Sequence, residues 1–206
     1  MQVLPGQKQV LAHFKRQDPK MAAIIRKVGP HRLSPDKEYF IVLARAIVSQ
    51  QISTKAAETI YNRFCSLFAR GRPRPRLTLD LSDEDLRQAG LSRQKISYMK
   101  DLARHFDEGL IKTRRFSKSD NEEIIGQLVQ VKGIGRWTAE MFLIFSLNRL
   151  DVLPVDDLGL KAGVQKIYKL KSQPDAKKLR AIGANWRPYE SIATWYCWQA
   201  LAGRAD

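Results

Sequence analysis

The stretch between Leu128 and Asp157 holds residue types that could bind a phosphate group. Gly133 and Gly135 bracket Ile134, between two stretches whose apolar residues recur at helical spacing. Glycines tolerate positive φ and let another backbone approach closely. Free N–H groups at the start of the second helix would favour an anion there, and a phosphate is the natural ligand. For the two glycines alone, an ordinary helical hairpin with a glycine C-cap remains the alternative.

Two carboxylates follow this hairpin, at Asp156 and Asp157, where a helix is expected to start. The helix dipole should keep a carboxylate at that place ionised. An ionised carboxylate can stabilise the positive charge that develops on a sugar when an N-glycosidic bond breaks, and it can orient or deprotonate water. A plain helix cap is the alternative for either aspartate.

The charge balance indicates a polyanionic partner. The chain has 206 residues, with 36 lysines and arginines against 21 acidic residues, a formal net charge of +15. This excess is unusual for an enzyme of small anionic metabolites and suits nucleic acid, where phosphate contacts dominate affinity. Solubility alone is the alternative. The proline-containing segment 70–76 predicts a basic loop, which could contact a DNA backbone or lie solvated at the surface.

The elements that must position these residues are predicted to be helices throughout, so the fold class is all-α. Ser53 is expected to cap a helix, Ser82 precedes an acidic helix start, and Gly90 is expected to end that helix. Candidate helices cover approximately residues 6–16, 18–28, 37–50, 53–70, 82–89, 92–108, 119–131, 136–148, 156–168, 174–183 and 186–201. The hydrophobic fraction of 44% is enough for a real core.

Cysteine and histidine usage argues against a zinc site or an iron–sulfur cluster. Cys65 and Cys197 lie far apart without a Cys-x-x-Cys pair, and the three histidines lack ligand spacing. The start of the chain does not resemble a signal peptide, and no apolar run reaches membrane-spanning length. A reduced, intracellular, soluble protein is therefore expected, with no membrane partner.

Four segments together resemble the helix-hairpin-helix DNA glycosylases, and within them the 3-methyladenine DNA glycosylase II branch. The matching segments are Val131–Ala139, Leu153–Asp157, Ala46–Ser53, and Trp186–Ser191 with Ala193 and Trp195–Trp198. They span about residues 40 to 200. The combination is specific, although its single pieces are not.

The resemblance implies an all-helical glycosylase fold of two helical subdomains with a cleft between them. The whole chain, 1–206, would be one glycosylase unit. The central subdomain would cover about 40–150, with the hairpin at 128–141, and the second would combine about 1–39 with 151–206. A monomer is expected, acting in the cytoplasm with the chromosome, or in the nucleus of a eukaryote.

The resemblance also assigns roles by position. Asp156 is expected to be the essential carboxylate, and Gln51 to fill the gap that a flipped base leaves. The hairpin should bind the DNA backbone, and the carbonyls of its turn can hold a monovalent cation, Na⁺ or K⁺. The hairpin residues concerned are Lys132, Gly133, Gly135 and Arg136 for DNA, and Val129, Val131 and Ile134 for the cation.

The expected base pocket is aromatic, formed by Trp137 and Tyr189 with Met141 one turn on, since an electron-rich ring attracts a cationic base. Plain core packing is the alternative for all three. Lyase-capable members carry a lysine where this chain has Trp137, so a monofunctional enzyme that uses water is expected.

The implied function is hydrolytic release of alkylated purines from damaged double-stranded DNA, with no cofactor required for chemistry. A glycosylase for oxidised, deaminated or mismatched bases, and a non-catalytic DNA-binding module, remain open.

Overall fold

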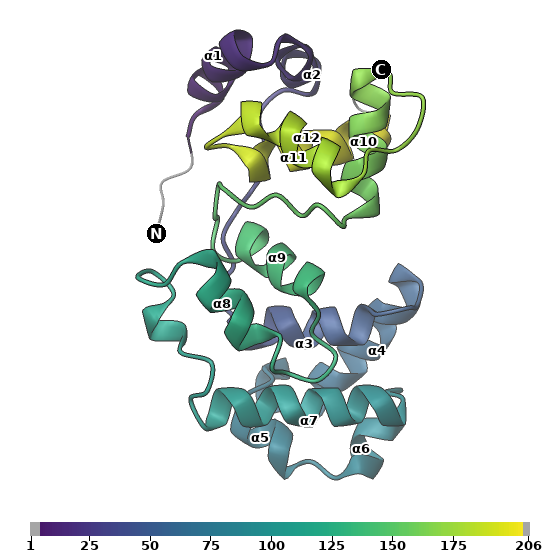
Figure 1. The fold of residues 1–206 in the computed structure, drawn as a ribbon. Coiled ribbons are helices and arrows are strands. Elements are labelled where there is room, and N and C mark those ends of the chain that lie inside the picture. The colour runs from purple at the N-terminus through teal and green to yellow at the C-terminus, as the bar shows by residue number, and fades with distance from the viewer. Residues whose placement is uncertain (1–4, 204–206) are drawn as a thin grey trace. The chain divides into compact units, whose positions relative to one another are not determined.

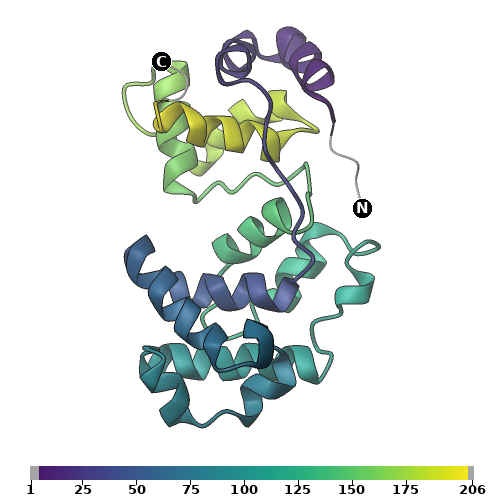
Figure 2. The same ribbon diagram turned by 180° about the vertical axis from the view of Figure 1, so that it is seen from behind.

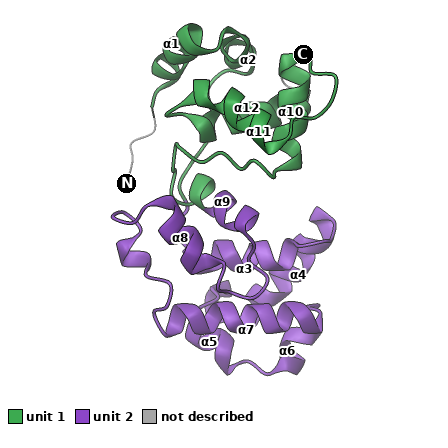
Figure 3. Ribbon diagram, viewed as in Figure 1, with its two compact units in different colours: residues 1–35, 143–206 green, residues 36–142 purple. Residues whose placement is uncertain are grey.

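The computed structural model describes residues 5–203, and within that range every regular element is a helix, which confirms the all-α prediction. The chain forms two compact units (Figure 3). Unit 1 combines residues 1–35 with 143–206, and unit 2 is residues 36–142. Across the described range, no helix combines the length and the apolar character that a membrane crossing requires.

Unit 1 is built around the C-terminal helix (Figure 1). Its helices are α1 Gln7–Gln17, α2 Pro19–Val28, α10 Leu158–Tyr168, α11 Ala176–Gly183 and α12 Glu190–Leu201, with the 3-10 turn η3 Ala184–Trp186. Helix α12 packs against α10 and α2, and most of its residues are buried. The close approach of α10 depends on Gly163, where a Cβ atom would lie 2.6 Å from the carbonyl oxygen of Cys197.

A buried aspartate joins three parts of unit 1. Asp18 lies between α1 and α2 and accepts a hydrogen bond from the Met21 N–H at 3.1 Å, which caps α2. Its other oxygen accepts from the Trp186 Nε1–H at 3.0 Å and from the Tyr168 hydroxyl. These partners satisfy a carboxylate that would be costly to bury alone.

Unit 2 is built around its longest helix, α7, which packs against α3, α5 and α6 (Figure 2). Its helices are α3 Tyr39–Ser49, α4 Thr54–Ser66, α5 Pro75–Asp80, α6 Asp83–Gln88, α7 Arg93–Asp107, α8 Asn121–Leu128 and α9 Arg136–Phe145, with 3-10 turns η1 Ala69–Gly71 and η2 Thr113–Arg115. Residues 143–145 of α9 belong to unit 1.

The predicted helix signals are confirmed. Ser53 caps α4, because its hydroxyl accepts from the Ala56 N–H at 3.3 Å. Ser82 and Asp85 form a reciprocal capping box at the start of α6. Gly90 adopts a φ of 102° directly after that helix.

Several predicted boundaries were wrong. The segment 70–76 is not wholly a loop, because Pro75 starts α5 at the first helical position, where proline is favoured. The helix predicted over 53–70 ends at Ser66, followed by a 3-10 turn. The helix predicted over 186–201 starts at Glu190, since Pro188 interrupts it, and the one predicted from 156 starts at Leu158.

Candidate active site and nucleic-acid interface

The predicted hairpin is a tight turn between two helices of unit 2. Helix α8 ends at Leu128, and the Val131 N–H donates to the Leu128 carbonyl at 3.1 Å. The Ile134 N–H donates to the Val131 carbonyl at 3.0 Å, and α9 begins at Arg136. Both apolar side chains, Val131 and Ile134, are buried. The turn is therefore anchored by its hydrophobic residues, while Gly135 is exposed.

The two glycines of the turn serve different purposes. Gly133 has a φ of 80°, and a Cβ atom there would lie 2.1 Å from the ring of Tyr98 on α7, so only glycine fits. Gly135 has no atom within 4 Å of its Cβ position. Gly133 allows the turn to pack on α7, whereas Gly135 leaves room for another backbone to approach.

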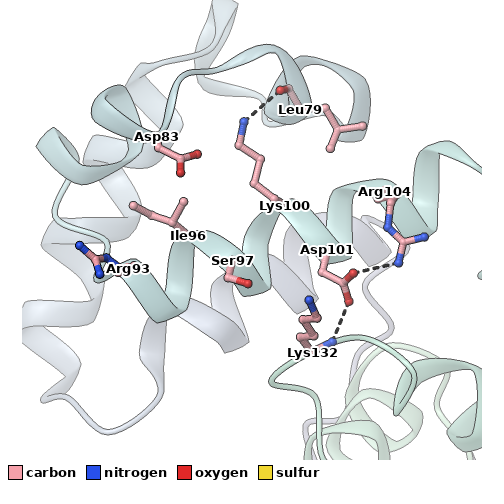
Figure 4. Close-up of a pocket in the computed structure, with 9 residues that line it drawn as sticks. All are labelled: Leu79, Asp83, Arg93, Ile96, Ser97, Lys100, Asp101, Arg104 and Lys132. Atoms are coloured by element: carbon pink, nitrogen blue, oxygen red, sulfur yellow. Dashed lines mark hydrogen bonds and ion pairs between the residues drawn. The ribbon is translucent and has the colours of Figure 1, made fainter.

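Two side chains from elsewhere in unit 2 hold the hairpin backbone. The Gln50 Nε2–H donates to the Gly133 carbonyl at 2.7 Å, and the Lys132 N–H donates to Asp101 Oδ2 at 2.9 Å (Figure 4). Burial alone would raise the pKa of Asp101, but the hydrogen bonds from the Lys132 N–H and Arg104 outweigh it and lower that pKa. Asp101 is therefore an ionised anchor at neutral pH.

The two cationic residues of the hairpin are placed differently. The Lys132 side chain is exposed and lines an open pocket beside α7, together with Arg93 and Arg104 (Figure 4). Arg136 instead pairs with two acidic residues. Its guanidinium donates to both carboxylate oxygens of Glu122, at 2.9 Å for the Nη1–Oε2 pair, and its Nε–H donates to Glu140 at 3.1 Å. Arg136 thus ties α8 to α9.

The predicted gap-filling residue, Gln51, lies between the end of α3 and the cap of α4. Its side chain is exposed, and its φ of 56° is in the left-handed region, which is uncommon for a residue other than glycine. Its neighbour Gln50 connects this loop to the hairpin. The structure therefore brings the loop and the hairpin together within unit 2.

The remaining candidates of unit 2 lie on or before α9. The Trp137 side chain is 51% exposed in the first turn of α9, and the half-buried Met141 follows one turn later. Val129, the first of the three candidate cation-binding carbonyls, follows α8 directly and is partly exposed.

Unit 1 carries the two candidate carboxylates, and their environments differ. Asp157 is buried, caps α10 by accepting from the Leu160 N–H, and accepts from the Trp198 Nε1–H at 2.8 Å. The Asp156 side chain is 77% exposed, and its carboxylate lies 4.0 Å from the Lys161 ammonium. Asp157 is engaged in holding the helix start, while the Asp156 carboxylate is exposed to solvent.

The segment that carries Asp156 is fastened to α11 and α12. The Ser191 N–H donates to the Leu150 carbonyl at 2.9 Å, and the Val152 N–H donates to the Ser191 hydroxyl at 3.1 Å. Gly183 of α11 makes room for Leu153, since a Cβ atom there would lie 2.6 Å from the leucine side chain. Asp156 therefore sits on irregular backbone with fixed ends.

Tyr189, the second predicted aromatic of the base pocket, is nearly buried in unit 1. Its hydroxyl accepts from the Gln9 Nε2–H at 3.1 Å, and its ring meets the His13 ring edge-on at 5.0 Å between centroids. Tyr189 and Asp156 belong to unit 1, whereas the other site residues belong to unit 2.

Sequence reasoning missed three residues that the structure places around these candidates: Gln50, Asp101 and Trp198. Gln50 and Trp198 each stood inside a recognised segment but carried no separate signal. Asp101 and Trp198 are 31 and 41 residues from their partners, and nothing in the local sequence marks such a pairing.

Comparison with known proteins identifies the family. The model of the HhH-GPD superfamily of base excision DNA repair proteins matches residues 44–188. DNA-3-methyladenine glycosylase 1 of Schizosaccharomyces pombe is 38% identical over 192 residues, covering 91% of this chain and 84% of the relative.

Two solved structures are similar over almost the whole chain. The S. pombe 3-methyladenine DNA glycosylase Mag1, in complex with abasic DNA, has a TM-score of 0.83 at 37% identity, covering 94% of this chain and 97% of that one. A DNA-3-methyladenine glycosidase from Bacillus halodurans has a TM-score of 0.84 at 39% identity, covering 94% and 87%. With its hairpin and its helical fold, the chain belongs to the HhH-GPD superfamily of base excision DNA repair proteins.

Proposed function

We propose that this protein hydrolyses the N-glycosidic bond of alkylated purines of the 3-methyladenine type in duplex DNA and leaves an abasic site. Relatives at 38% and 32% identity are named DNA-3-methyladenine glycosylase 1 and alkylbase DNA glycosidase-like protein. The observation that carries the proposal is the exposed carboxylate of Asp156 beside a neighbour, Asp157, that is engaged in capping α10.

In the proposed reaction, Asp156 acts on the sugar. As the bond between C1′ and the base nitrogen breaks, positive charge develops on the sugar, and the ionised carboxylate stabilises it. A water molecule adds to C1′ and loses a proton to the carboxylate or to solvent. The base takes the electron pair of the broken bond, and because an alkylated purine starts as a cation it leaves as a neutral molecule.

An aromatic surface suits such a base. The exposed ring of Trp137 offers a π-face that attracts a cation, and Met141 lies one turn along on α9. Tyr189 would contribute its ring from unit 1. Since Trp137 stands where a lyase would need a lysine, no Schiff base is expected, and the enzyme is monofunctional.

The proposed DNA contacts lie in unit 2. The backbone at Gly133 and Gly135, with Lys132, holds a phosphate, and Arg136 keeps the hairpin in place beside it. Gln51 fills the gap in the duplex, where its amide can pair with the orphaned base. The proposed partner of the protein is therefore damaged duplex DNA. We propose that the protein acts as a monomer and is located with the chromosome.

Glycosylases of this type need no cofactor for the chemistry. A Na⁺ or K⁺ ion at the hairpin would have a structural role, held by the carbonyls of Val129, Val131 and Ile134. Neutral carbonyl oxygens at the end of a helix suit a monovalent cation, and the Val131 carbonyl, which already accepts one hydrogen bond, keeps a second lone pair. No iron–sulfur cluster is proposed, because the two cysteines are far apart in sequence.

A gel assay on duplex oligonucleotides, each with a single lesion, tests this function. Strand cleavage of the alkylated substrate only after alkali is expected. Cleavage without alkali would mean a lyase. Release of oxidised, deaminated or mismatched bases instead would change the substrate class, and tight binding without any release would leave a DNA-binding module.

A further inference from the structure

One side chain joins the two loops of unit 2 that the proposed function assigns to DNA. Gln50 is the C-cap residue of α3 and directly precedes Gln51. Its Nε2–H donates to the carbonyl oxygen of Gly133 at 2.7 Å, across a separation of 83 residues, and the bond is partly buried. The loop 50–53, which contains Gln51 and is called the gap-filling loop below, is therefore linked to the hairpin by a short, partly buried hydrogen bond.

We propose that Gln50 is a positioning residue that fixes Gln51 relative to the phosphate-binding hairpin, so that both loops engage the duplex as one rigid surface. The proposal rests on the proposed function, because it takes Gln51 to enter the DNA and the hairpin to hold a phosphate. Gln50 itself need not touch the reacting atoms.

The conformation of the loop supports this role. Gln51 holds a φ of 56°, a costly conformation that persists only where the surroundings determine it. The chain is fixed on one side by the Gln50 side chain and on the other by Ser53, which caps α4. Gln51 thus projects from a turn whose two ends are both tied down.

Side chains of helix α7 contact both the end of α3 that leads into the gap-filling loop and the hairpin. The Lys95 ammonium donates to the Val48 carbonyl at 2.6 Å, close to the end of α3. Tyr98 lies against Gly133, and Asp101 accepts from the Lys132 N–H. These three residues each contact one of the loops or the helix end that leads into it, whereas Gln50 bridges the loops directly.

A fixed distance between the phosphate-binding hairpin and Gln51 is needed for one step of the proposed reaction, the extrusion of the base. Extruding a paired base requires the duplex to be unstacked while its backbone is held, whereas the chemical step at the sugar depends on Asp156. Loss of the Gln50 bond should therefore slow release of a paired lesion and spare a lesion that has no pairing partner to lose. A merely structural role would slow both substrates equally.

The experiment measures single-turnover release of an alkylated purine from two duplexes, with the lesion opposite its partner base or opposite an abasic site. Gln50→Ala should reduce the rate about tenfold on the paired duplex, the loss that corresponds to a single hydrogen bond of about 1.4 kcal/mol, and by less than about twofold on the other. The matched control is Gln88→Ala on α6, an exposed glutamine whose side chain bonds, among the described residues, to Glu84 of its own helix at 3.4 Å. The control should match the unsubstituted protein on both duplexes.

A second variant tests the hydrogen bond itself. In Gln50→Glu, an ionised carboxylate would face the Gly133 carbonyl, whereas the protonated form could donate to it. Its rate on the paired duplex, relative to Gln50→Ala, should rise as the pH falls from about 7 to about 5, towards the usual pKa range of a glutamate.

A double-mutant cycle tests whether Gln50 acts through Gln51. Because Gln51→Gly removes the gap-filling side chain and suits the left-handed backbone, adding Gln50→Ala to it should cost little more. Full additivity, an equal loss on both duplexes, or no loss at all would overturn the proposal. If the unsubstituted protein releases no base from either duplex, it is the proposed function that fails.

Discussion

The hairpin of unit 2 and the aspartate segment of unit 1 differ in how their polar groups are engaged. In the hairpin, the Gly133 carbonyl and the Lys132 N–H are bound by Gln50 and Asp101, and Arg136 is held by two carboxylates. In the aspartate segment, the Asp156 carboxylate has one partner among the described residues, the Lys161 ammonium at 4.0 Å.

This difference follows from what each region is proposed to do. A phosphate site made of backbone groups binds only while the backbone keeps its conformation. Surrounding side chains must therefore hydrogen-bond to that backbone and hold it in place. A carboxylate that stabilises charge on a sugar must have its oxygens available. In the aspartate segment, Asp157 has the structural role because it caps α10, whereas the Asp156 side chain is exposed. Four substitutions, two of them measured beside a control variant, test this division, from the largest expected effect to the smallest.

Asp156→Asn should have the largest effect and should confine it to catalysis. The amide keeps the shape but loses the negative charge, so base release should fall roughly 10²- to 10³-fold, as for other groups that stabilise charge in a transition state. Single-turnover release measures the rate, and fluorescence anisotropy with lesion-containing duplex measures binding.

Binding and thermal stability of Asp156→Asn should stay close to those of the unsubstituted protein, because the side chain is exposed. Turnover at the normal rate would remove Asp156 from the proposed chemistry. A large loss of stability instead would mean that the two aspartates do not divide their tasks in this way.

Gly133→Ala should damage the hairpin itself. The added methyl would lie 2.1 Å from the Tyr98 ring, at a φ of 80° that alanine rarely adopts, so the turn must shift. A loss of about 1–3 kcal/mol in the free energy of unfolding is expected, with weaker DNA binding. Urea unfolding and anisotropy measure the two quantities.

Gly135→Ala is the matched control, two positions along. Its Cβ would meet nothing within 4 Å and its φ is not positive, so the free energy of unfolding should hardly change. If a DNA backbone approaches this glycine, binding should still weaken. Equal stability losses for the two variants would contradict the distinction between them.

Asp157→Ala should mainly lower stability, whereas Asp156→Asn should mainly lower the rate of base release. It removes the cap of α10 and leaves the partly buried Trp198 Nε1–H without its acceptor, so the free energy of unfolding should drop by about 2 kcal/mol. Asp156→Ala, measured beside it by urea unfolding, should change stability by less than about 0.5 kcal/mol. The opposite ranking would assign the cap to the wrong aspartate.

The sequence predicted the parts of the fold and site that depend on local signals. Helical spacing, the caps at Ser53 and Ser82, and the glycine pair of the hairpin are readable because the residues that specify them are adjacent along the chain. Helix α5 is not predicted from the sequence, because proline breaks a helix interior, whereas Pro75 occupies the first helical position, where proline is favoured.

The supports of the site could not be predicted in the same way. The bonds from Gln50 to Gly133 and from Trp198 to Asp157 join residues 83 and 41 positions apart, so they exist only once the helices have packed. The two adjacent aspartates were equally eligible as caps. What separates them is the position of α10, which starts two residues after Asp156 and so places the capping geometry at Asp157.

The smallest effect concerns Asp101, and it sharpens the comparison through its dependence on pH. The pKa of this carboxyl is lowered from its usual 3.8 in the folded protein, where it holds the Lys132 N–H. A group with a lowered pKa stabilises the fold above its unfolded-state pKa, and this contribution is lost as the pH falls through the folded-state value. Asp101→Asn should therefore cost about 1 kcal/mol in the free energy of unfolding at pH 7, and the difference from the unsubstituted protein should shrink below about pH 4. Urea unfolding between pH 7 and pH 3 measures it. A difference that stays constant over this range would show that the charge of Asp101 does not hold the hairpin, because the cost of the substitution would then not depend on whether the carboxyl group is ionised.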